Sequence, residues 1–180
     1  LLITYCRSAD LFRIQAVTPT LTEQSLTPNA SLQKAYEANS IVAPLKTSSY
    51  FIADDGSDND GDGNPDQIPA LYKMSTIDGL EVPDAHPIAK GVELMSLSYG
   101  VNTSGDEFAD SYVNADAVPD WGNVVSVRIS LLVKSIEDYI TDEPVSVTFV
   151  DGTLVNSGDN ADRRLRLLFS STVTLRNRVP

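Results

Sequence analysis

The residues best suited to chemistry form an acidic segment, residues 54–66, which holds six aspartates and no Lys or Arg. Like charges at this density repel one another, and a bound cation removes that penalty. Counted from Asp58 as position 1, aspartates fall at positions 1, 3, 5 and 9, a glycine at position 6 and an asparagine at position 7. This is the spacing of a calcium-binding loop, in which position 7 supplies a backbone carbonyl. The sequence therefore predicts a Ca²⁺ site with the ligands Asp58, Asp60, Asp62, Asn64 and Asp66.

This segment differs from the helix-loop-helix calcium hand in two respects. Position 12, which is a bidentate glutamate in that hand, is Pro69 here. The flanking residues 48–53 and 70–74 have the composition of strands. The segment is therefore expected to be the exposed tip of a hairpin, similar to the DxDxDGxxD loops of extracellular modules. The alternative is a solvated acidic loop that binds cations weakly.

A second polar loop, residues 102–110, repeats the spacing with weaker ligands. Its oxygen-bearing side chains stand at the same relative positions, but Glu107 occupies the place of the turn glycine. The pattern indicates a degenerate copy of the first loop that no longer binds a metal strongly. The ligands of this second candidate site would be Asn102, Ser104, Asp106 and Asp110.

Other kinds of chemistry have little support in the composition. With one histidine and one cysteine, the chain cannot build a transition-metal site of the usual kind. The sequence contains no nucleophile elbow, P-loop or dinucleotide-binding fingerprint, so we predict no enzymatic activity and no catalytic residues. Its net charge of −12 argues against nucleic acid or an anionic membrane surface as a partner. His86 is expected on the surface, and Cys6 is expected to be either a buried apolar residue or a cysteine whose partner lies in the missing N-terminal part.

Hydrophobic alternation predicts a mainly β chain with antiparallel sheets and a single domain over residues 1–180. One short helix is expected at residues 31–38, and residues 18–31 and 77–87 are expected to be loops. Asp151 and Gly152 predict a type I′ hairpin turn, and Trp121 is expected to be a core anchor. The predicted strands are 1–6, 11–17, 48–53, 70–74, 90–101, 124–134, 145–150, 153–155 and 163–179.

Two of these strands have clearly different faces. Residues 124–134 place Val, Ile and Leu on one face and Ser, Arg and Lys on the other. Residues 163–179 alternate in the same way and carry five of the thirteen basic residues. We expect this last strand to be half-exposed, with its polar face paired to the acidic loops.

The strand and turn residues of the second half of the chain, in their order, resemble the C-terminal part of PilW-type minor pilins. Two earlier segments, Cys6 with residues 9–12 and residues 69–73, fit the same family. The resemblance covers most of the chain and consists of strand residues and turns rather than a catalytic signature. It rests mainly on residues 91–94, 98–101, 110–115, 120–121, 124–135 and 163–178.

The resemblance implies a pilin-like α+β protein of which this chain is the head domain. A prepilin leader and a hydrophobic N-terminal helix, absent from this fragment, would precede Leu1 and provide the only membrane contact. The expected role is structural: priming of type IV pilus assembly, with a place at the pilus tip. The expected partners are other minor pilins and the major pilin, in the inner membrane, periplasm and extracellular pilus of a Gram-negative bacterium. The resemblance does not extend to the calcium loop.

Two alternative functions remain open from the sequence. The first is a calcium-binding extracellular module in cell adhesion, because the acidic loop fits such modules. The second is a minor pseudopilin of a type II secretion system, because the heads of larger minor pseudopilins are similar to those of minor pilins.

Overall fold

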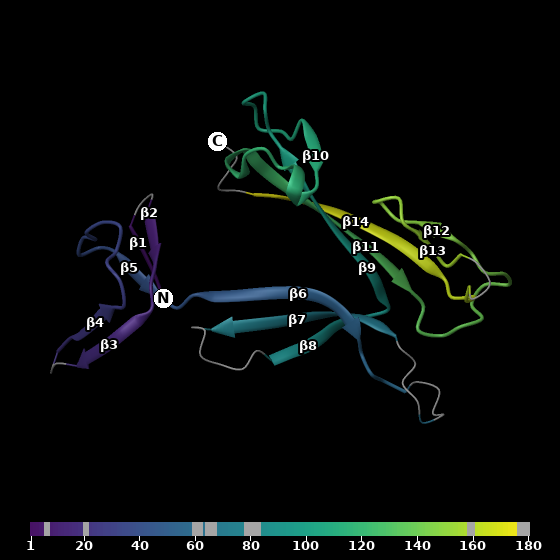
Figure 1. Cartoon of the computed structure of the whole chain (residues 1–180), viewed down its shortest axis with the longest axis horizontal. Helices are drawn as coiled ribbons and strands as arrows, with labels where there is room; N and C mark the ends of the chain where they lie inside the picture. The colour runs from purple at the N-terminus through teal and green to yellow at the C-terminus, as the bar shows by residue number, and fades with distance from the viewer. Residues whose placement is uncertain are drawn as a thin grey trace. The chain divides into compact units, whose positions relative to one another are not determined.

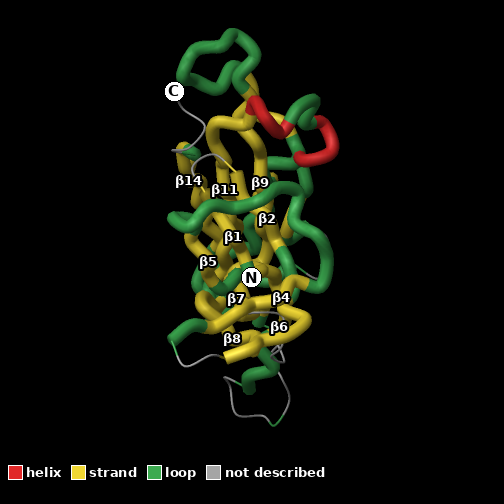
Figure 2. The backbone as a smooth tube through the Cα atoms, turned by 90° about the vertical axis from the view of Figure 1, so that its left-hand side faces the viewer, coloured by secondary structure: helices red, strands yellow, loops and turns green. Residues whose placement is uncertain are grey.

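The computed structural model is built almost entirely of antiparallel strands, and it describes residues 1–5, 8–19, 22–58, 63, 68–77, 84–157 and 161–175. Strands dominate the trace in Figure 2, and the helical part of the described residues is limited to the 3₁₀ turns Ala115–Ala117 and Trp121–Asn123. The predicted mainly β fold is therefore confirmed. Over the same described residues, no helix has the length and apolar character needed to cross a membrane.

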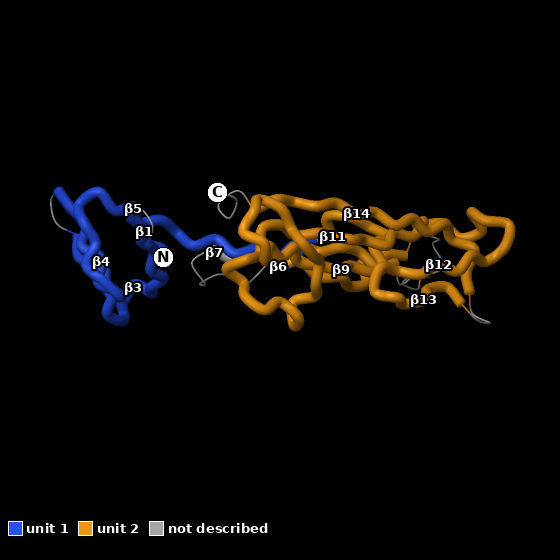
Figure 3. The backbone as a smooth tube through the Cα atoms, turned by 90° about the horizontal axis from the view of Figure 1, so that it is seen from above, with its two compact units in different colours: residues 1–49, 73–86 blue, residues 50–72, 87–180 orange. Residues whose placement is uncertain are grey.

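The chain divides into two compact units, which Figure 3 distinguishes by colour. Unit 1 comprises residues 1–49 and 73–86, and unit 2 comprises residues 50–72 and 87–180. The chain passes between them within three strands that form one sheet: β6 (Lys46–Asp54), β7 (Pro69–Ile77) and β8 (Asp84–Lys90). The division describes local compactness, and the single-domain organisation over residues 1–180 stays a prediction.

Unit 1 contains two small antiparallel sheets (Figure 1). One has the order β2-β1-β5, and the other pairs β3 with β4. Residues 8–10, which lie between two of the predicted strands, belong to β2, and residues 24–28, expected to be loop, form β4. The strand bounds are β1 Leu2–Tyr5, β2 Ser8–Leu11, β3 Ile14–Pro19, β4 Gln24–Pro28 and β5 Ile41–Ala43.

The helix expected at residues 31–38 is absent, and this segment has an irregular conformation instead. Eight residues are too few to nucleate a helix without tertiary support. The tertiary contacts of this segment hold its start and its side chains: the carboxylate of Asp10 accepts a hydrogen bond of 2.8 Å from the backbone N–H of Gln33. The ammonium group of Lys34 lies over the rings of Tyr5 and Tyr36, 5.9 and 5.1 Å from their centroids.

Unit 2 is organised around a four-stranded antiparallel sheet of order β10-β9-β11-β14. The central strand β11 has the predicted bounds, Val124–Lys134. The small hairpin β12–β13 was also predicted, although its strands are shorter than expected. The remaining bounds are β9 Val92–Val101, β10 Ser111–Val113, β12 Val147–Thr148, β13 Leu154–Val155 and β14 Arg166–Thr174.

The turn of the β12–β13 hairpin differs from the predicted type I′ turn. Such a turn needs positive φ at both central residues, whereas here Gly152 has φ +90° and Asp151 is outside the left-handed region. The N–H of Gly152 donates to the carbonyl of Phe149 (3.0 Å), and that of Phe149 donates to the carbonyl of Thr153 (2.8 Å). This is a three-residue connection, in which a type I turn is followed by one left-handed glycine.

The strand β9 begins after a turn at Gly91, two residues later than predicted. Gly91 has φ +80°, donates its N–H to the carbonyl of Pro69 (2.7 Å) and accepts from the N–H of Lys134 (2.7 Å). A Cβ at this position would overlap the carbonyl oxygen of Lys134. Glycine is therefore required both by the backbone conformation and by the close approach of β11.

The two faces of the unit 2 sheet are unequally covered. On β11, the face expected to be polar contains the buried residues Ser126, Ser130 and Leu132, whereas Val127, Ile129, Leu131 and Val133 on the other face are partly exposed. Each buried serine forms a hydrogen bond with another hydroxyl group: Ser126 with Tyr112 (3.1 Å) and Ser130 with Ser170 (3.1 Å). Alternation therefore identified the faces correctly but not which face is covered.

Candidate functional site

The acidic hairpin between β6 and β7 has a well-packed base in unit 2. The N–H of Asp55 donates to the carbonyl of Ile68 (3.1 Å), whose side chain is fully buried. One step further from the tip, the rings of Phe51 and Tyr72 stack with a centroid distance of 5.6 Å, and the Tyr72 hydroxyl donates to the carbonyl of Asp54 (3.3 Å). The two strands thus hold Asp55, at the start of the acidic segment, beside Ile68, which follows the segment.

Asp55 joins this base to β8 through an ion pair. Its Oδ2 lies 2.8 Å from the Nζ of Lys90, and its side chain is only 3% exposed. Its Oδ1 accepts from the backbone N–H and the hydroxyl of Ser57, at 3.0 and 2.7 Å. The Lys90 ammonium and the two Ser57 donors lower the pKa of the Asp55 carboxyl to about 2. Asp55 is therefore an anchor of the hairpin rather than a free metal ligand.

A pH dependence follows from this anchor. The pKa of Asp55 is lower in the folded protein than in the unfolded chain, where a value of about 3.9 is expected. Its contribution to stability is therefore complete above about pH 4 and is lost as the pH falls towards 2. In urea unfolding at several pH values, Asp55→Asn should be less stable than the parent protein at pH 5, and the difference should shrink by pH 2. Asp54→Asn, which changes the neighbouring exposed carboxylate, is the matched control; an Asp55 difference that persists at pH 2 would contradict the ion-pair assignment.

The predicted calcium ligands lie mostly outside the described residues. This holds for Asp60, Asp62, Asn64 and Asp66, whereas Asp58 and Gly63 are described. Gly63 has φ +88°, and its N–H donates to Oδ2 of Asp58 (2.8 Å). The contact joins the residues at positions 1 and 6 of the calcium spacing. Among the described residues, no three acidic, histidine or cysteine side chains gather in a metal-binding arrangement, and the calcium site stays a prediction.

The second loop, residues 102–110, is closed by its own hydrogen bonds. Oδ2 of Asp110 accepts three bonds, from the N–H and hydroxyl of Thr103 (2.6 and 2.9 Å) and the N–H of Ser104 (3.0 Å). These donors lower the pKa of the Asp110 carboxyl. Oδ1 of Asn102 accepts from the N–H of Gly105 (2.8 Å), which has φ +85° and makes the sharp turn in place of Glu107. A cation at this loop would have to compete with protein donors for both oxygens.

The other residues singled out in the sequence, His86, Cys6 and Trp121, are not brought together into a site by the described part of the structure. His86 is exposed as expected, but it lies in β8 rather than in a loop, and Cys6 lies outside the described residues. Trp121, expected in the core, is 51% exposed and meets the ring of Tyr99 edge to face at 4.9 Å. Trp121 therefore packs against one aromatic ring at the end of the sheet and is not a core residue.

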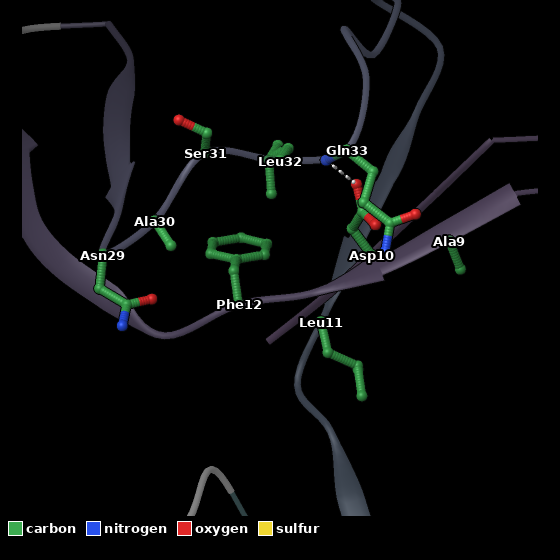
Figure 4. Close-up of a pocket in the computed structure, with 9 residues that line it drawn as sticks. All are labelled: Ala9, Asp10, Leu11, Phe12, Asn29, Ala30, Ser31, Leu32 and Gln33. Carbon is green, nitrogen blue, oxygen red and sulfur yellow. Dashed lines mark hydrogen bonds between the residues drawn. The ribbon is translucent and has the colours of Figure 1, made fainter.

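A pocket of about 390 Å³ in unit 1 is lined by residues 9–12 and 29–33 (Figure 4). The ring of Phe12 points into it, between Ala30 and Leu32, whereas Leu11 points away. Asp10 is 6% exposed, and its carboxylate is already used by the N–H of Gln33. Partial burial and the nearby Asp10 charge raise the pKa of Tyr36. The polar groups of this pocket thus fix the segment that follows β4.

An ion-pair network that the sequence did not reveal connects three parts of unit 2. Arg166, with a side chain 3% exposed, binds Glu93 of β9 through Nε and Nη2 (2.8 and 3.1 Å) and Asp162 through Nη1 and Nη2 (2.6 and 2.9 Å). The bond from Arg166 lowers the pKa of Asp162, and both carboxylates raise that of Arg166. The alternation had placed Arg166 on a polar face, but no local pattern links it to Glu93, 73 positions away.

The other face of the sheet is apolar and incompletely covered. Paired positions place β9, β11 and β14 side chains together: Tyr99, Val127 and Val173 in one row, and Met95, Leu131 and Phe169 in another. The β14 members are half-exposed, at 50% for Val173 and 54% for Phe169, and Leu97 of β9 is 39% exposed. Contiguous apolar surface of this kind marks an interaction site in soluble domains. We call this surface, made by Met95, Leu97, Tyr99, Val127, Ile129, Leu131, Val133, Leu167, Phe169 and Val173, the open face.

Comparison with known proteins gives one match. A protein-family model described as type IV pilus-assembly protein W matches residues 49–177, well over half of the chain and including the acidic hairpin and the whole four-stranded sheet. No curated protein and no solved structure matches the chain.

Proposed function

Because the chain belongs to the PilW family of type IV pilus-assembly proteins, we propose that it is a minor pilin whose work is structural. The observation that carries this proposal is the open face. A catalytic protein concentrates polar groups in a cleft, whereas the open face is apolar and lies on a regular sheet. Such a surface suits packing against other subunits, and membership of a pilus-assembly family supports a role of this kind in the cell envelope.

The proposal extends to parts that precede this chain. A hydrophobic N-terminal helix with a prepilin leader would anchor the protein in the inner membrane and join the pilus core. The head would then take part in priming assembly with other minor pilins and the major pilin, and would be carried to the pilus tip. The reading frame upstream of Leu1 tests this part directly: a hydrophobic prepilin segment is expected there, and its absence would refute the pilin assignment.

The open face can be tested in a strain that lacks the gene. Complementation with the parent gene should restore surface pili, and complementation with Leu97→Lys should not, because a charge on the open face blocks apolar packing. Ile88→Lys is the matched control, since Ile88 is 48% exposed but lies in β8, outside the open face. Pili are counted by electron microscopy, with membrane levels of each variant measured by immunoblot. Normal piliation with Leu97→Lys, or in the deletion strain itself, would refute the proposal.

We also propose that the acidic hairpin binds Ca²⁺. The bond between Asp58 and Gly63 supports the loop conformation that the spacing requires, and the Asp55–Lys90 ion pair holds its base in place. Calcium would neutralise the remaining carboxylates and fix the tip.

Calcium should therefore raise the melting temperature. An ion that binds only the folded state stabilises it by about 2.7 kcal/mol at one hundred times its Kd. Asp60→Ala should remove most of this rise, whereas Asp106→Ala in the second loop should keep it. Differential scanning fluorimetry with Ca²⁺ and with a chelator measures both. Equal melting temperatures in the two conditions would reject the site.

A further inference from the structure

The last strand of the unit 2 sheet has an open outer edge. Of the described strands, β14 pairs with β11 alone, and every residue from Leu167 to Thr174 is exposed. Figure 3 shows β14 along one margin of unit 2. The exposed side chains are on both faces of the strand: Leu168 is 45% exposed on one, and Leu167 and Phe169 are 51% and 54% exposed on the other.

The hydrogen-bond pattern shows which backbone groups face outward. The carbonyl of Leu165 accepts from Ser135 and the N–H of Leu175 donates to Val125, both at 2.8 Å, so the odd-numbered residues of this strand face β11. In an antiparallel ladder the N–H and C=O of one residue point to the same side, and the next residue points to the other. The outward donors and acceptors therefore belong to the even-numbered residues Arg166, Leu168, Ser170, Thr172 and Thr174.

This edge lacks the devices that usually prevent strand addition. Protected edges are short, charged, interrupted by proline or distorted by a bulge. The opposite edge of the sheet, β10, is only three residues long. In contrast, β14 pairs with β11 over nine consecutive residues without a register shift and has neither a charge nor a proline between Leu167 and Thr174.

We propose that β14 is a self-association edge, which pairs antiparallel with β14 of a second copy of this chain about a two-fold axis at Ser170. In this register Ser170 faces Ser170 of the other copy, and Arg166 and Leu168 face Thr174 and Thr172. All five outward-facing residues of each copy then meet outward-facing residues, and the two sheets become one continuous sheet.

The side chains fit the same register. Leu167 faces Val173, and the large Phe169 faces the small Ser171, so the apolar rows of the two copies meet on one face without opposed large rings. Arg166, the only charged residue of β14, is neutralised within its own subunit by Glu93 and Asp162. No uncompensated like charges of the described strand are brought together.

The association should be weak and strengthened by salt. A nine-residue strand spans about 30 Å, and one strand pair covers less surface than a stable dimer normally buries. Each copy also carries a net charge of −12, which opposes association until salt screens it. The salt dependence therefore distinguishes pairing at this edge from an association driven by opposite charges, which salt would weaken.

Sedimentation velocity over a range of protein concentrations, at 50 and 500 mM NaCl, tests the proposal. The parent protein should form dimers that increase with concentration and with salt. Ser170→Lys and Ser170→Glu should each be monomeric, since each places like charges face to face at the axis. An equimolar mixture of the two variants should recover the dimer, because lysine then faces glutamate.

A second variant distinguishes the loss of edge pairing from a loss of folding. Leu168→Pro removes an outward N–H and leaves the odd-numbered donors to β11 in place, a position that tolerates proline. It should melt as a folded protein and remain monomeric, whereas Leu168→Val should dimerise. A parent protein that stays monomeric at both salt concentrations, a mixture of the two Ser170 variants that fails to recover the dimer, or a dimer that survives Leu168→Pro would each overturn the proposal.

Discussion

Arg166→Met should lower the free energy of unfolding by about 3–5 kcal/mol, the usual cost of removing one partner from a buried ion pair. The guanidinium group is 3% exposed and makes four short contacts with Glu93 and Asp162. Without it, two carboxylates that are only 19% and 25% exposed lose their closest cation and keep only the longer contacts, 3.9 Å each, with Lys134 and Arg164. Urea unfolding monitored by circular dichroism measures the loss.

Two further variants identify the cause. Glu93→Gln and Asp162→Asn, added to Arg166→Met, should recover part of the stability because the two carboxylates that lost their closest cation are then neutral. Arg166→Lys should lie between the parent and Arg166→Met, since a single ammonium group cannot bind both carboxylates in the bidentate geometry of a guanidinium group. A loss below about 1 kcal/mol for Arg166→Met would show that the network behaves as an exposed surface pair.

Gly91→Ala should destabilise the protein by about 3 kcal/mol. An alanine at φ +80° costs about 1–3 kcal/mol, and its Cβ would also overlap the Lys134 carbonyl, which adds an overpacking cost. The melting temperature should fall by roughly 6–12 °C, at 2–4 °C per kcal/mol for a chain of this size.

Gly105→Ala separates the two costs at Gly91. Gly105 has a similar φ of +85°, but a Cβ there would meet no atom within 4 Å. Its alanine variant should therefore show the backbone strain alone, about 1 kcal/mol. Equal losses in the two variants would mean that the sheet moves away from Gly91 without cost.

The parts of the fold that depend on local pattern were predictable. Alternation over residues 124–134 gave the bounds of the central strand, and the acidic segment was placed correctly between two strands. The hairpin at Asp151 and Gly152 was also predicted correctly. The predicted type I′ turn was wrong, because the Asp-Gly dipeptide fits more than one turn type. The loop at 102–110 was likewise predicted from its polar residues.

The errors arose where distant contacts override local preference. The segment 31–38 has helical spacing, but a helix of eight residues needs tertiary support, and the bond to Asp10, 23 positions away, fixes only the start of the segment. The alternating pattern of β11 distinguishes two faces, but the sequence does not show that hydroxyl pairs allow Ser126 and Ser130 to be buried while the aliphatic face stays half-open. Likewise, the Arg166 network and the Asp55–Lys90 anchor join residues from separate segments of the chain, so no motif contains them.

The alternation of backbone direction along β14 also has a kinetic consequence. Amide protons that are bonded within a sheet exchange with solvent only when the sheet opens, whereas amides that face solvent exchange freely. Hydrogen exchange should therefore alternate in rate along this strand in the monomer, slow at Phe169 and Ser171 and fast at Leu168 and Ser170. Neighbouring amides of a single strand would thus report on two different events: the odd-numbered on opening of the sheet within one subunit, and the even-numbered on the occupancy of its edge.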